Sequence, residues 1–193
     1  MRGKLATVVV SLGMLAMGAC SGEDGGADGG EVETDTVSAA EYATGMCGAI
    51  AGWIEDIQRL NADLQANLDP TASLDSLKDM TVGFLGDVTD ATDAVIDEVE
   101  AVGVPDVEDG QAAADTVLAF LRDSRDVFVD ARESVQGLST ADPAAFGTEL
   151  ETIGNDIQTS MSGIGNQLGQ LDSSELNEAS EDVPECEQVA SAA

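Results

Sequence analysis

The sequence predicts an all-α protein whose folded part, residues 37–171, is an up-down-up-down antiparallel four-helix bundle. Apolar residues recur at steps of three and four along four segments, which is the period of an amphipathic helix. Prolines at positions 70, 105, 143 and 184 divide the chain into segments of similar length. No segment shows the alternation of apolar and polar residues that indicates a strand. Short connections then require each helix to run antiparallel to the next.

The first residues are typical of an export signal. Arg2 and Lys4 give a basic start, and residues 5–17 form an apolar run. A membrane-spanning helix needs roughly 20 apolar residues, so this shorter run matches the core of a signal peptide. We expect residues 1–19 to be a signal peptide.

The end of this segment, Gly18-Ala19-Cys20, resembles the lipobox of bacterial lipoproteins, although Met17 stands where Leu, Val or Ile is usual. In that family the cysteine thiol receives a diacylglyceryl group, and cleavage makes this cysteine the new N-terminus. The resemblance implies lipid on Cys20 and attachment to a membrane. The alternative is an ordinary secretory signal that is cleaved near Ala19.

Residues 20–36 form the predicted linker. The stretch 21–35 is rich in Gly, Asp and Glu and holds one large apolar residue, Val32, so it cannot bury enough surface to fold. A flexible tether of this length spans about 20 Å and can hold a domain off a membrane.

The chain is strongly acidic, with 38 Asp and Glu against 7 Lys and Arg in 193 residues and a formal charge of −31. This charge excludes binding to the nucleic-acid backbone. It also repels anionic lipid, so the lipid on Cys20 rather than the protein surface would contact the membrane. The absence of histidine excludes Ser-His-Asp and Cys-His catalysis and the common histidine-containing zinc sites.

Each predicted helix carries one apolar stripe and is about 30 residues, or about 45 Å, long. The first has Met46, Ile50, Trp53, Ile57, Leu60 and Leu64. The second has Leu74, Leu77, Thr81, Phe84, Val88, Ala91, Val95, Val99 and Val102. The third has Val107, Ala114, Val117, Leu121, Phe128, Ala131, Val135 and Leu138. The fourth has Phe146, Leu150, Ile153, Ile157, Met161, Ile164, Leu168 and Leu171.

Proline and polar residues mark the helix starts. Asp69-Pro70 and Asp142-Pro143 each indicate an N-cap followed by proline at the first helical position. The run Gly103-Val104-Pro105-Asp106 indicates a helix stop followed directly by a new N-cap.

Glycine weakens the fourth helix, which we expect to be the least stable of the four. Its Gly165 and Gly169 are expected to allow a close approach to Gly48 and Gly52 of the first helix.

The chain has three cysteines. With Cys20 assigned to lipid, Cys47 and Cys186 remain as an even pair in an oxidising compartment. The predicted topology places the start of the first helix beside the end of the fourth, so we expect a disulfide; the alternative is two free thiols. The bond would tether the tail, residues 172–193, in which we expect a short helix over 174–180.

The arginines of the third helix are expected to pair mainly with the fourth. The turn between them is centred near residues 140–141, so residues whose numbers sum to about 281 lie level in an antiparallel hairpin. This predicts the pairs Arg132 with Glu149 and Arg125 with Asp156.

Arg122 has no acidic residue level with it on the fourth helix, so Asp126 or Asp87 is its expected partner. The alternative for the three arginines, Arg122, Arg125 and Arg132, is a site for an anion or an anionic partner. Two acidic rows are expected to be solvated faces rather than cation sites. They are Asp90, Asp93, Asp97 and Glu100, and Asp123, Asp126, Asp130 and Glu133.

Trp53 lies in an apolar stripe, so we expect it to pack in the core; the alternative is that Trp53 and Tyr42 line a ligand pocket. No acidic residue lies in a stripe, where burial could tune it for general acid–base chemistry.

The signal, the acidic linker and the ending with Leu176, Ala179, Pro184 and Cys186 resemble small actinobacterial-type lipoproteins of unassigned function. The resemblance implies no activity. We therefore expect a non-enzymatic, lipid-anchored domain on the extracytoplasmic face of the cell membrane, with a binding or structural role toward an envelope protein and with no metal or cofactor. The alternative is a carrier or sensor of a small apolar ligand held between the helices, which a cavity of several hundred cubic ångströms would favour.

Overall fold

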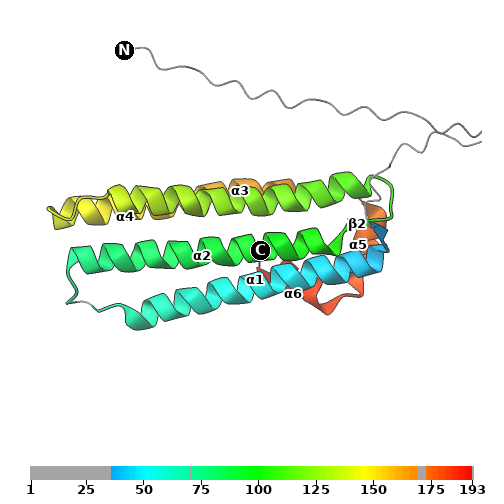
Figure 1. Ribbon diagram of the computed structural model, residues 1–193, viewed down its shortest axis with the longest axis horizontal. Helices are drawn as coiled ribbons and strands as arrows, with labels where there is room; N and C mark the ends of the chain where they lie inside the picture. The colour runs from blue at the N-terminus through cyan, green and yellow to red at the C-terminus, as the bar shows by residue number, and fades with distance from the viewer. Residues whose placement is uncertain (1–35, 70, 169–172, 193) are drawn as a thin grey trace, which may run out of the picture. The chain divides into compact units, whose positions relative to one another are not determined.

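Four long helices carry most of the chain in the computed structural model, which describes residues 36–69, 71–168 and 173–192 (Figure 1). They are α1 (Ala39–Asn67), α2 (Leu74–Val102), α3 (Gly110–Gly137) and α4 (Pro143–Leu168). Two short helices follow, α5 (Ser174–Glu181) and α6 (Pro184–Ala192). The predicted all-α class is confirmed, and α5 confirms the short helix expected in the tail.

Consecutive long helices pack on one another, α1 on α2, α2 on α3 and α3 on α4 (Figure 1). Helix α1 also packs on α5 and α6. The contacts between α2 and α3 run in reverse order along the two helices. Arg122 of α3 meets Glu100 of α2, Arg125 meets Asp93, and Lys78 Nζ donates to the carbonyl oxygen of Leu138.

The core lies where the predicted stripes of α1, α2 and α3 meet. Its buried residues are Ile50, Trp53, Val95, Ile96, Val99, Val117 and Leu121. Met161 of α4 packs against this cluster. A second cluster of Leu85, Ala131 and Val135 receives three predicted α4 residues, Leu150, Ile153 and Ile157. The stripes therefore identify the buried face of each long helix.

Side-chain caps start α1 and α4. Ser38 and Glu41 form a reciprocal capping box at α1. Asp142 caps α4 as predicted, because its carboxylate accepts from the N–H groups of Ala144 and Ala145 at 2.9 and 3.3 Å.

The predicted start of α2 is wrong. Ser73, not Asp69, is its N-cap, with Ser73 Oγ accepting from the Ser76 N–H. The Asp69 carboxylate instead accepts from the N–H and hydroxyl of Thr71, at 2.8 and 2.7 Å. Asp69 is equally suited to an Asx turn and to a cap, and the turn is the one that forms.

The predicted start of α3 and the expected absence of strands are also wrong. Thr36–Val37 (β1) and Val104–Pro105 (β2) pair as a two-residue parallel bridge, which is too short to produce alternation. Helix α3 begins at Gly110, after Asp109 in the left-handed region with φ 58°. A Cβ on Gly110 would lie 2.0 Å from the carbonyl oxygen of Pro105, so this turn requires glycine.

The close approach of helices involves a different glycine from those predicted. A Cβ on Gly45 of α1 would lie 2.8 Å from Val102 Cγ2 of α2. Apart from the adjacent residues and the nearby backbone of α1 itself, no atom of the described residues lies within 4 Å of a Cβ built on Gly48 or Gly52. Gly169, half of the expected partner motif, falls outside the described residues.

Candidate functional site

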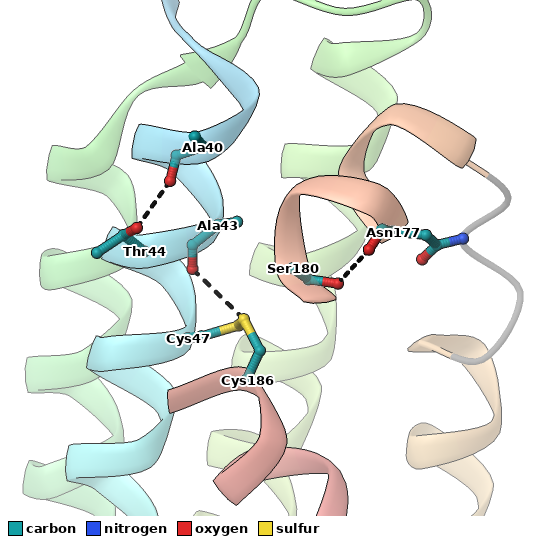
Figure 2. Close-up of a disulfide and its surroundings, with 7 residues drawn as sticks. All are labelled: Ala40, Ala43, Thr44, Cys47, Asn177, Ser180 and Cys186. Carbon is teal, nitrogen blue, oxygen red and sulfur yellow. Dashed lines mark hydrogen bonds between the residues drawn. A yellow bond between two sulfur atoms is a disulfide. The ribbon is translucent and has the colours of Figure 1, made fainter. Parts of the chain in front are cut away.

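A disulfide joins Cys47 of α1 to Cys186 of α6, with 5.0 Å between the two Cα atoms (Figure 2). This confirms the predicted pair. Both half-cystines are buried in a small cluster with Ala43 and Val183, and the Cys186 sulfur lies 3.8 Å from the Ala43 carbonyl oxygen. The bond therefore holds the start of α6 against the third turn of α1.

Helix α5 lies beside α1 next to this disulfide (Figure 2). Between them is a cavity of about 100 Å³, which we call the α5 cavity. Its lining is mostly apolar. The residues are Tyr42, Ala43, Met46, Ala113, Val117, Ser173, Leu176, Asn177 and Ser180.

Tyr42 is the most buried aromatic side chain of the domain, at 1% exposed. Its hydroxyl has no hydrogen-bond partner among the described residues. A buried hydroxyl without a partner costs about 1–3 kcal/mol. Burial raises the pKa of Tyr42 to about 12, and the nearby Asp115 carboxylate adds to the shift. The phenol therefore keeps its proton, and its hydrogen-bonding capacity is unused.

Tyr42 also lines a second hollow of about 410 Å³, which we call the β2 cavity. Its lining includes Glu100, Gly103 and Val104 from the end of α2 and β2, and Gln111 from α3. Charged and amide side chains at its wall make it more polar than the α5 cavity.

The sequence offered Tyr42 as a pocket residue only in the alternative that it and Trp53 line a ligand pocket, and the structure places Tyr42 in the wall of both cavities. Trp53 does not line either cavity and packs in the core, as expected. Tyr42 lies four residues before Met46 and eight before Ile50, so the apolar stripe of α1 extends one turn further back than predicted. That spacing was the available signal for its burial.

The predicted partners of the α3 arginines are wrong. Arg125 Nε donates to Asp93 of α2 at 2.9 Å, and its Nη1 donates to Asp126 at 3.1 Å. Arg122 pairs with Glu100 of α2 rather than with Asp126 or Asp87.

Arg132 also lies against α2, with its Cζ 3.4 Å from the position of a Cβ on Gly86. Glu149 and Asp156 form no ion pair among the described residues. The register of a helical hairpin determines how far along the axis two residues lie. It does not determine which way their side chains point around the axis. On α3 this arginine face is turned to α2.

The acidic rows are partly neutralised by these arginines, since Asp93 and Glu100 of the first row and Asp126 of the second form ion pairs with them. Within the ranges that the structure describes, no group of three His, Cys, Asp or Glu residues is placed to hold a metal ion. No helix in those ranges is both long and apolar enough to cross a membrane. Cys20, the predicted lipid site, lies outside the described residues.

The chain matches no protein family model, no curated protein and no solved structure.

Proposed function

We propose that this chain is a non-enzymatic, lipid-anchored helical domain on the extracytoplasmic face of the cell membrane. The observation that carries the proposal is the Cys47–Cys186 disulfide. Such bonds persist in oxidising compartments and are rare in the cytosol. An exported chain needs a signal, and residues 5–17 have the length and composition of one.

The third cysteine completes this proposal. Cys20 has no place in the disulfide, and it follows two small residues at the end of the apolar run. Lipid on Cys20 would attach the domain to the membrane through the acidic linker. Because the chain carries a formal charge of −31, the acidic domain would be repelled from anionic headgroups. The anchor and the charge together would present the helices to an envelope protein.

The architecture that we propose for the anchored domain is the up-down-up-down antiparallel bundle of α1 to α4. Three short connections and the packing of each long helix on the next support it. The reversed order of the contacts between α2 and α3 supports it for that pair.

Fractionation of cells that express the full chain tests the anchor. In a bacterial host that processes lipoproteins, the wild-type chain should partition into the detergent phase at mature size. Cys20→Ala should accumulate as a precursor or be released as a water-soluble domain. Cys186→Ala is the matched control, because it removes a cysteine but leaves the lipid site. A Cys20→Ala chain that still partitions into detergent at mature size would overturn the anchor.

The alternative role, a carrier or sensor of a small apolar ligand, rests on a separate observation. A mostly apolar cavity lies between α1, α3 and α5, and it is lined by Tyr42, whose buried hydroxyl has no partner among the described residues. The α5 cavity, at about 100 Å³, is smaller than the several hundred cubic ångströms expected for such a carrier, so it would hold a correspondingly small ligand. Ligand sites combine an apolar lining with a small number of placed polar groups. This second function does not depend on the lipid anchor.

A further inference from the structure

We infer that the α5 cavity is a binding site for a small, uncharged, largely apolar molecule with one hydrogen-bond acceptor, which the Tyr42 hydroxyl would meet as donor. The inference rests on the carrier or sensor function proposed above. It adds the chemical class of the ligand and the residue that selects it.

The lining decides the body of the ligand. Ala43, Met46 and Val117 supply apolar side chains to the lining from α1 and α3, and Leu176 supplies one from α5. Apolar cavities of about 150 Å³ admit benzene, so the smaller α5 cavity, at about 100 Å³, suits a body of at most about six heavy atoms.

The Tyr42 hydroxyl determines which polar group the ligand can carry. A phenol that keeps its proton is a donor, so a carbonyl, ether or alcohol oxygen satisfies it. The Asp115 carboxylate nearby and the negative charge of the chain disfavour an anion. A cation would lose its hydration in an apolar lining without a paired carboxylate there.

Helix α5 is the wall that can move. None of its residues is buried, whereas the neighbouring start of α6 is fixed by the disulfide. An element with few buried contacts opens at low free-energy cost. The Tyr42 hydroxyl has less than 1 Å² of accessible surface, so a ligand reaches it when α5 or the flexible Met46 side chain shifts. Ligand binding would therefore require a shift of α5 or Met46 and would form a new hydrogen bond from the Tyr42 hydroxyl to the ligand.

Ligand-observed NMR titration of the full, oxidised chain tests this site with cyclopentanone and cyclopentane as probes. The two rings have similar shape, and cyclopentanone alone carries an acceptor. Tyr42→Phe removes the hydroxyl and keeps the ring. We expect it to weaken cyclopentanone binding about tenfold, which corresponds to one hydrogen bond of about 1.4 kcal/mol. Cyclopentane binding should be unchanged.

Two neighbouring alanines of α3 locate the probe. Ala113 lines the α5 cavity and Ala114 lines the β2 cavity, and both are buried. Ala113→Leu should abolish binding of both probes, whereas a folded Ala114→Leu should retain it. If Ala113→Leu fails to fold, Ser180→Leu fills the same cavity from α5 and should give the same loss.

The possible results distinguish an error in the proposed ligand class from an error in the proposed carrier function. If Tyr42→Phe does not weaken cyclopentanone binding, the ligand needs no hydrogen-bond acceptor and the inference is wrong. The carrier function for apolar molecules would then still stand. Loss of binding in a folded Ala114→Leu but not in Ala113→Leu would overturn the α5 cavity as the site. If neither probe binds, both the inference and the carrier function are wrong. Tyr42 is the single tyrosine of the chain, so ¹³Cζ-tyrosine gives one signal, which should shift with cyclopentanone.

Discussion

The indole Nε1–H of Trp53 in α1 donates a 3.1 Å hydrogen bond to Oγ1 of Thr92 in α2, and both side chains are buried. The Thr92 hydroxyl in turn donates to the Val88 carbonyl oxygen at 2.8 Å. The Trp53 ring meets Phe120 of α3 edge to face, with 6.4 Å between ring centroids. One side chain of α1 thus contacts both neighbouring helices, and its polar atom has a specific partner.

Replacement of Thr92 by valine should destabilise the domain. Thr92→Val keeps the shape but leaves the buried indole N–H without an acceptor, which costs about 1–3 kcal/mol in the free energy of unfolding. Thr89→Val is the matched control, because Thr89 is also buried and its hydroxyl bonds to the Leu85 carbonyl oxygen. Urea unfolding of both variants measures the difference. Equal losses would show that the Trp53 bond contributes nothing.

Alanine should have opposite effects at two glycines of α1. Gly45→Ala places a methyl group 2.8 Å from Val102 Cγ2 and should lower the free energy of unfolding by about 1–3 kcal/mol through overpacking. Gly52 is exposed with no described atom outside α1 within 4 Å, so Gly52→Ala should raise it by about 0.5–1 kcal/mol through helix propensity. Thermal unfolding compares them. A stabilising Gly45→Ala would contradict the close approach of α1 and α2.

Charge reversal should distinguish the two possible partners of the α3 arginines. The double variant Arg122→Glu with Glu100→Arg should recover stability that each single variant loses, with a coupling of about 0.2–1 kcal/mol because the pair is exposed. The same cycle with Arg132→Glu and Glu149→Arg should be additive. Coupling in the second cycle and not in the first would restore α4 as the partner.

Stability should fall at high pH because of Tyr42. Its pKa is about 12 in the folded chain against the ordinary 10.0, so the folded state holds the proton more tightly. The free energy of unfolding therefore decreases as the pH rises from about 10 towards about 12.

Tyr42→Phe is the reference for that measurement, since it removes the phenol and leaves every other titratable group in place. The wild-type chain should lose stability faster than the variant over this range. A tyrosinate absorbance that appears near pH 10 in the folded chain would contradict the buried, partnerless hydroxyl.

Local signals made the helices, the core and the disulfide predictable. The stripe of each long helix was visible because the helical period puts every third or fourth residue on one face. Cys47 and Cys186 followed from counting, since an exported chain leaves few cysteines unpaired.

Features that depend on tertiary geometry were not predictable. β1 and β2 pair over only two residues each, and a stretch of two residues is too short to show the alternation of apolar and polar residues that indicates a strand. Arg125 turns to Asp93 because of the rotation of α3 about its axis, which the hairpin register does not determine. The unused hydroxyl of Tyr42 depends on how α3 and α5 pack around it, although its burial matches the spacing of the stripe.

Intact-mass measurement of the chain extracted from membranes tests the anchored, disulfide-closed domain most directly. We expect a species that lacks residues 1–19, carries a diacylglyceryl group on Cys20, and gains two hydrogens on reduction as Cys47 and Cys186 become thiols. A chain that retains residues 1–19 with an unmodified Cys20, or that shows two alkylatable thiols before reduction, would contradict it.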